Sequence, residues 1–134
     1  MHKKVLENIV LAKEVLKEAK CYKPRHAGNG HAQGGLGGVG VENWILKNGG
    51  SFEKAARTFL EAAESVNSFS DFCEIYRIFD FGENHLYYRH DDKYKHDEFV
   101  SNNMDVEGYN KMKEALKKYL YELDERRNNK KVID

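Results

Sequence analysis

Apolar residues recur at steps of three and four in three parts of the chain, with charged residues between them. This spacing places the apolar side chains along one face of an α-helix. The first set is Val5, Ile9, Ala12, Leu16 and Ala19. The second set is Phe52, Ala55, Ala56, Phe59, Leu60, Ala63 and Val66, and the third is Val106, Tyr109, Met112, Leu116, Tyr119, Leu120 and Leu123. The pattern predicts helices over residues 1–20 and 106–124, and another that begins after Ser51.

Polar residues indicate where helices begin. Ser51 can serve as the N-cap of the second helix, because its hydroxyl can accept a hydrogen bond from a backbone N–H of the first turn. Ser68, followed by Asp71, resembles another cap, for a brief helix over residues 69–75. Asp105 can cap the last helix, and we expect the tail after residue 124 to fray.

The short apolar segment 41–46 fits either a strand or a helix by pattern alone. The sequence Asn48-Gly49-Gly50 that follows it favours a short helix with a glycine C-cap. Residues 41–66 should therefore hold two helices. Residues 24–40 are rich in glycine and lack periodicity, which predicts a long loop.

Residues 82–105 are polar and aromatic, so we expect irregular structure with room for a small β-hairpin around Leu86–Val100. The whole chain, residues 1–134, is predicted to be one mainly α domain. Its expected architecture is a compact bundle of four to five helices with a long Gly-rich loop.

Composition narrows the possible partners. The 134 residues carry 22 basic and 22 acidic side chains, so bulk charge indicates neither a nucleic acid nor a membrane partner. No apolar run is long enough to span a membrane, and no leader peptide is recognisable, which favours a cytoplasmic protein. Cys21 and Cys73 are too few for a disulfide framework, so we expect reduced thiols with no disulfide partner.

The glycine tract is the first candidate for a binding site. Gly37, Gly38 and Gly40 precede the segment 41–46, and the free N–H groups at the start of a helix can hold an anion. The same glycines could instead permit close packing against a neighbouring helix. Two histidines of the loop, His26 and His31, could contact a phosphate or act as a general base, or could simply be exposed.

A second candidate is a polar cluster that contains the residue types that bind Zn²⁺ or Mn²⁺. Its members are His85, His90, His96, Asp91, Asp92 and Asp97. Their spacing fits no compact metal motif, so solvated side chains are the alternative interpretation.

The order of segments from about residue 5 to residue 120 resembles a known family. The segments are LAKEVLK at 11–17, Cys21-Tyr22, GLGGV at 35–39, VENWIL at 41–46 and NGGSF at 48–52. Their order and spacing are similar to those of the helical substrate-binding domain of archaeal-type CCA-adding enzymes. That domain is related to domains of poly(A) polymerases and oligoadenylate synthetases.

The resemblance implies a nucleotide- or RNA-binding substrate domain of a nucleotidyltransferase. The family's helix lysine and turn tyrosine contact the incoming nucleotide, and Lys13 and Tyr22 stand at the similar positions. A lysine ammonium can contact a triphosphate, and a phenol can hydrogen-bond or stack. Mg²⁺ could accompany the nucleotide. From the residues alone, Lys13 could also be a solvated helix residue and Tyr22 a rim aromatic.

Transfer by the two-metal mechanism needs paired carboxylates that hold Mg²⁺. Asp91 and Asp92 are adjacent and would point to opposite faces of a strand, so they do not form such a pair. We therefore expect no catalysis by this chain alone, and a catalytic nucleotidyltransferase domain in the same or a separate chain. The alternatives are a small His-dependent or metal-dependent enzyme and a helical protein-interaction module.

Overall fold

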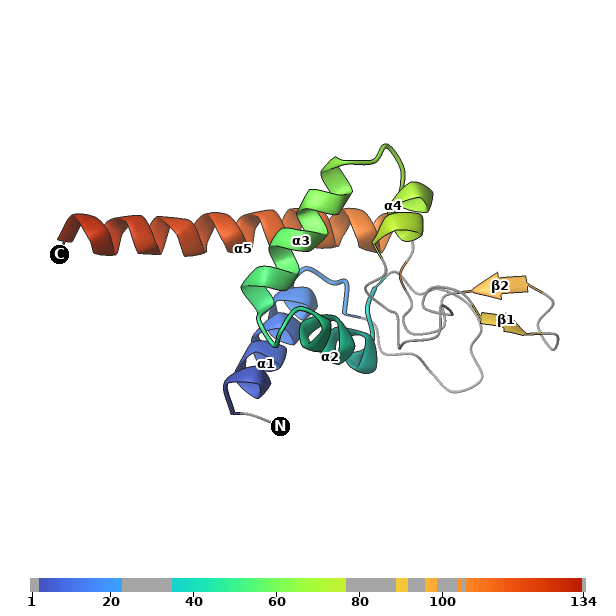
Figure 1. Cartoon of the computed structure of the whole chain (residues 1–134), viewed down its shortest axis with the longest axis horizontal. Helices are drawn as coiled ribbons and strands as arrows, with labels where there is room; N and C mark the ends of the chain where they lie inside the picture. The colour runs from blue at the N-terminus through green and yellow to red at the C-terminus, as the bar shows by residue number, and fades with distance from the viewer. Residues whose placement is uncertain are drawn as a thin grey trace.

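Helices dominate the described part of the chain (Figure 1). The structure is a computed structural model, and it describes residues 3–22, 35–76, 89–91, 96–98, 104 and 106–133, with backbone alone for residues 39, 89–91, 96–98 and 131–133. The helices are α1 (Lys3–Glu18), α2 (Gly38–Lys47), α3 (Phe52–Glu64), α4 (Phe69–Ile75) and α5 (Val106–Ile133). The mainly α fold is the one that the sequence predicts.

Two strands of three residues lie within the segment for which the sequence predicts irregular structure or a small hairpin. β1 (Arg89–Asp91) and β2 (His96–Glu98) pair antiparallel, with Arg89 opposite Glu98. In Figure 1 these strands lie at the opposite end of the molecule from the C terminus.

The predicted serine caps of α3 and α4 are confirmed. The Ser51 hydroxyl accepts a hydrogen bond of 3.1 Å from the backbone N–H of Lys54. The Ser68 hydroxyl accepts one of the same length from the N–H of Asp71. Each cap satisfies a backbone donor that has no partner inside its helix, which is why these two helices begin where the sequence indicates.

The predicted glycine C-cap of α2 is also confirmed. The N–H of Gly50 donates to the carbonyl of Ile45 at 2.9 Å, and the N–H of Gly49 donates to the carbonyl of Leu46 at 3.2 Å. These are the two bonds of a Schellman motif. Gly49 and Gly50 both have positive φ, 71° and 79°, a conformation that side chains with a Cβ rarely adopt.

The Gly-rich loop is shorter at its C-terminal end than residues 24–40. Helix α2 begins at Gly38 rather than at residue 41, and the Val41 N–H donates to the Gly37 carbonyl at 3.0 Å. Burial of Leu36, Val41 and Trp44 explains the earlier start, because tertiary packing outweighs the low helix propensity of glycine. Residues 23–34 of the predicted loop lie outside the described residues.

Helix α5 is longer than predicted, since residues 125–133, which we expected to fray, continue it to Ile133. Ion pairs with α3 anchor the beginning of this extension. The Arg127 guanidinium donates two hydrogen bonds, of 2.7 and 2.8 Å, to the two carboxylate oxygens of Glu53. Arg57 donates to Asp124 at 2.9 Å. These contacts hold the helix where the sequence offers no apolar stripe, and Figure 1 shows α5 running past the other helices.

The core contains buried residues of all five helices, and within it the ring of Phe59 on α3 contacts α2, α4 and α5. The ring centroid of Phe59 lies 6.1 Å from that of Trp44, 4.8 Å from that of Phe72 and 5.9 Å from that of Tyr109. The predicted stripes of α1 and α3 contribute buried or partly buried side chains throughout. The stripe of α5 does so except at Val106, which is 56% exposed because it stands at the first position of the helix.

One polar network crosses this apolar core. The indole N–H of Trp44 donates to the Tyr76 hydroxyl at 3.0 Å, and that hydroxyl lies 2.8 Å from the Thr58 hydroxyl. Burial raises the pKa of Tyr76. The network satisfies the Trp44 donor, which would otherwise be costly to bury, and it ties α2, α3 and the residue after α4 together.

Cys21 and Cys73 are both buried, neither forms a disulfide within the described residues, and burial raises the pKa of the Cys73 thiol to about 12. None of the described helices combines the length and the apolar character that crossing a bilayer requires.

The Glu53 ion pairs should make stability depend on acid pH. Hydrogen bonding to Arg127 and then to Arg57, opposed by partial burial, lowers the pKa of Glu53 from 4.5 to about 2. Because the folded-state pKa is the lower one, this stabilisation is complete above pH 4.5 and is lost as pH falls towards 2. We expect Glu53→Gln to flatten the fall in unfolding free energy across that window, as measured by urea denaturation. Glu114→Gln, at an exposed pair on α5, is the control, and identical profiles for Glu53→Gln and wild type would contradict the prediction.

The two glycines of the α2 C-cap should differ in their tolerance of alanine. A Cβ at Gly50 would lie 2.6 Å from Cγ2 of Val5, whereas one at Gly49 would meet nothing within 4 Å. Gly49→Ala should therefore cost only the left-handed backbone term, about 1 kcal/mol. Gly50→Ala adds a steric clash with α1 and should cost about 3 kcal/mol. Thermal unfolding of both variants tests this, and equal losses would show that α1 moves away freely.

Candidate functional site

The end of α1 delivers Tyr22 to the start of α2. Lys20 has a left-handed backbone with φ 63°, and the Cys21 N–H donates to the Leu16 carbonyl at 2.9 Å, which closes the helix. The Cys21 carbonyl in turn accepts a hydrogen bond of 2.8 Å from the Leu36 N–H. Tyr22 and Leu36 form an isolated parallel bridge. The two described ends of the glycine loop are thereby joined beside the first turn of α2.

Three of the residues selected from the sequence meet at Gly38. A Cβ built on Gly38 would lie 3.1 Å from the Tyr22 hydroxyl oxygen and 3.8 Å from Nζ of Lys13. It would also lie 3.8 Å from Oε2 of Glu42, one turn further along α2. The missing side chain therefore lets the Tyr22 hydroxyl approach the backbone of α2 more closely than a residue with a Cβ would allow.

The electrostatics of this site combine two lysines and one carboxylate. Nζ of Lys13 lies 3.3 Å from Oε2 of Glu42, and both side chains are partly exposed, at 26% and 41%. Nζ of Lys17, one turn after Lys13, lies 5.2 Å from the centroid of the Tyr22 ring, within the range of a cation–π contact. The positive charges exceed the negative one, so the site suits an anion.

Backbone donors add to that positive character. The first intrahelical acceptor of α2 is the Gly37 carbonyl, which accepts from Val41. The N–H groups of residues 38–40 precede this bond and have no acceptor within the helix. Gly37, the N-cap residue, has no side chain to accept from them. Gly37 and Gly40 are buried and Gly38 is partly exposed, so Gly38 is the glycine of the tract through which a ligand could approach the first turn.

The structure thus brings together Lys13, Tyr22 and the glycines of the tract. Two further residues, Glu42 and Lys17, were not selected from the sequence. Lys17 could have been, because a residue four positions after Lys13 lies on the same helix face. Glu42 could not have been, because its contact with Lys13 joins residues 29 positions apart.

Of the five candidate histidines, the structure describes only His90 and His96, and these by their backbone alone. His26, His31 and His85 lie outside the described residues. The backbone of the hairpin places His90 opposite Asp97 and His96 opposite Asp91. Among the residues that the structure describes, no three His, Cys, Asp or Glu side chains form a group that could hold a metal ion.

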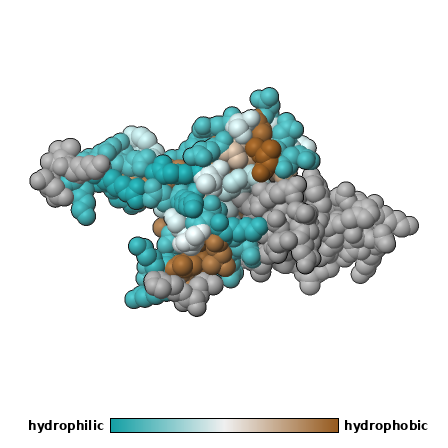
Figure 2. Space-filling view, viewed as in Figure 1, coloured by the Kyte–Doolittle hydropathy of each residue, from teal (hydrophilic) through white to brown (hydrophobic). Residues whose placement is uncertain are grey.

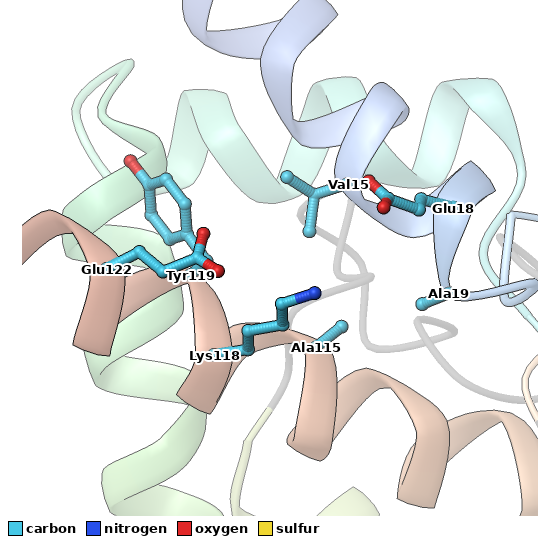
Figure 3. Close-up of a pocket in the computed structure, with 7 residues that line it drawn as sticks. All are labelled: Val15, Glu18, Ala19, Ala115, Lys118, Tyr119 and Glu122. Carbon is cyan, nitrogen blue, oxygen red and sulfur yellow. The ribbon is translucent and has the colours of Figure 1, made fainter.

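A separate groove of about 430 Å³ lies between α1 and α5 (Figure 3). Figure 3 shows Val15 extending from α1 towards α5, and Lys118 extending from α5 towards α1. The carboxylates of Glu18 and Glu122 also line the groove. None of its lining residues is a site residue selected from the sequence. Its two carboxylates outnumber its one ammonium group, that of Lys118, so the groove disfavours an anionic ligand.

Comparisons of the chain with protein families, with curated proteins and with solved structures found no match.

The left-handed residue that positions Tyr22 yields a stability prediction. Lys20 holds a positive φ that costs a residue with a Cβ about 1 kcal/mol or more. Lys20→Gly should relieve this cost and stabilise the fold by about 0.5–1 kcal/mol, after the greater entropy loss of glycine on folding. Lys20→Ala, which keeps the Cβ, should give no such gain. Urea denaturation of both variants tests this, and equal effects would show that the conformation is not strained.

Proposed function

We propose that this chain is a cytoplasmic nucleotide- or RNA-binding substrate domain, which works with a nucleotidyltransferase catalytic domain in the same or a separate chain. The observation that carries the proposal is the meeting of Lys13, Tyr22 and Gly38 at the start of α2. The first two stand where the resembling family has its nucleotide-contacting lysine and tyrosine. The third has no Cβ, so the polar ends of the other two lie close to the backbone of the first turn of α2.

A phosphate group fits the chemistry of this site. The first-turn N–H groups of α2 and the positive end of the helix dipole favour an anion. Lys13 supplies a mobile ammonium, and charge-assisted bonds of this kind are stronger than neutral ones. The Tyr22 phenol then lies beside the anion, where it can hydrogen-bond to the nucleotide or stack on its base. A Mg²⁺ ion bound to the phosphates would enter with the nucleotide.

Glu42 has a specific part in this proposal. Its carboxylate holds Lys13 at 3.3 Å, so a phosphate must compete with it for the ammonium. The same carboxylate stands one turn into α2, where it disfavours a second negative charge nearby. Removal of this charge should strengthen phosphate binding, whereas removal of the lysine charge should weaken it.

The test is an NMR titration of the full chain with ATP and then with a short single-stranded RNA, each with and without Mg²⁺. Saturable shifts clustered at Lys13, Tyr22 and residues 35–41 are expected. Lys13→Met should weaken ATP binding roughly tenfold, the loss expected for one charge-assisted contact. Glu42→Gln should strengthen it several-fold at low salt.

Lys117→Met is the matched control, because Lys117 is an exposed helix lysine on α5 that also pairs with a glutamate. It should leave the affinity unchanged. The absence of shifts at millimolar ATP or RNA would count against the proposal. So would shifts that Lys13→Met and Lys117→Met diminish to the same extent, because they would indicate a nonspecific charge effect.

A further inference from the structure

The C-terminal end of α5 carries a run of positive charge. From residue 126 to residue 133 the sequence has no acidic residue, and its basic residues there are Arg126, Arg127, Lys130 and Lys131. Two lysines in the first half of the helix are paired instead. Nζ of Lys111 lies 3.2 Å from Oε1 of Glu107. Nζ of Lys117 lies 3.6 Å from Oε1 of Glu114. The balance of charge along α5 therefore ends near residue 126.

Two cations of this end remain available to a partner. Arg127 pairs with Glu53, whereas Arg126 and Lys130 are exposed and have no carboxylate within ion-pair distance among the described residues. Glu122, one turn before Arg126, lines the groove between α1 and α5.

The spacing of these two cations does not serve the helix itself. Arg126 and Lys130 stand four positions apart, so they share a face, and like charges at this spacing destabilise a helix. The helix dipole favours cations in the last turn, and Arg126 lies before it. An external anion would relieve the repulsion between the two side chains.

This end of the helix projects from the fold. Lys130 stands eleven positions after Tyr119, whose ring stacks on Phe52, and this length of helix spans about 16 Å. Figure 1 shows α5 extending beyond the other described helices, and Figure 2 shows mostly hydrophilic residues over this part. Helix α2, whose start carries the candidate site, lies well away from the C terminus in Figure 1. An extended ligand could contact both places, whereas a mononucleotide at the start of α2 would contact only one.

We propose that the C-terminal end of α5 binds the phosphate backbone of a single-stranded RNA whose end occupies the site at the start of α2. The inference rests on the proposed function and narrows the substrate to a polynucleotide. Phosphodiester groups supply negative charge to Arg126 and Lys130. Contacts of this kind position a nucleic acid without reading its bases. A membrane suits the surface less well, because residues 124–130 include no apolar residue to enter a bilayer.

Fluorescence anisotropy of the full chain with labelled oligouridine tests the proposal. The two RNAs have about 3 and about 20 nucleotides, to bracket the usual site sizes of single-strand binding. For the longer RNA, Arg126→Gln/Lys130→Gln should reduce the slope of log affinity against log salt by about 1.4, since each phosphate contact contributes about 0.7. The same variant should leave the affinities for the shorter RNA and for ATP unchanged.

Two further double variants are the controls. Lys111→Gln/Lys117→Gln removes the same charge from the first half of α5, where both lysines pair with glutamates, and should leave the slope unchanged. Arg126→Lys/Lys130→Arg keeps both charges and should retain the wild-type slope. Circular dichroism of each variant verifies that the helices are intact.

Equal reductions of the slope in the two glutamine variants would overturn the proposal, because they would reflect overall charge alone. A longer RNA that does not bind, or whose slope ignores Arg126→Gln/Lys130→Gln, would also overturn it. So would binding to vesicles of anionic phospholipid that this variant abolishes while RNA affinity stays unchanged, because the surface would then face a membrane.

The proposed function can fail separately from this inference. ATP that causes no shifts at Lys13 would count against the site at the start of α2, whereas a reduced salt slope for the longer RNA would still support the α5 contact. ATP binding at Lys13, combined with an RNA slope that the α5 charges do not affect, would overturn the α5 contact alone.

Discussion

The aromatic packing around Phe59 is the interaction on which the other contacts of the fold depend. This one ring on α3 contacts Trp44 of α2, Phe72 of α4 and Tyr109 of α5. Trp44 can be fully buried there only because the Tyr76 hydroxyl accepts its indole N–H. The packing therefore fixes the direction of α2 together with that of α3. Truncation of the Phe59 ring would loosen three helix contacts at once.

The orientation of α2 in turn positions the candidate site. Trp44 and Ile45 are buried near the C-terminal end of this ten-residue helix. Its first turn, at the other end, therefore lies towards the end of α1. Asn8 adds a tether between α1 and α3, since its Oδ1 atom accepts the Phe52 N–H at 2.9 Å. The left-handed turn at Lys20 then places Tyr22 against Gly38. The geometry of the site is thus a consequence of core packing, to which the Lys13–Glu42 pair and the hydrogen bond between Leu36 and Cys21 add contacts within the site.

Local signals explain which parts of the fold could be predicted. The caps at Ser51 and Ser68 and the glycine C-cap of α2 depend on residues close in sequence, and the structure has all three. The contact that anchors the start of the α5 extension joins Arg127 to Glu53, 74 positions away, so no local pattern could indicate that contact. For the site, Gly38 was selected from the glycine tract, and Lys13 and Tyr22 through a resemblance. Glu42 belongs to the site through a contact across the fold. The residues 23–34 between Tyr22 and the tract lie outside the described part.

Helix α1 shows how a chain with equal numbers of basic and acidic residues can still have distinct surfaces. With no net charge, the positions of the charges decide what each face can contact. One face of α1 is buried in the core, one flank places Lys13 against Glu42, and the remaining face mixes charged and exposed apolar side chains: Lys3, Leu6, Glu7, Val10, Leu11 and Glu14.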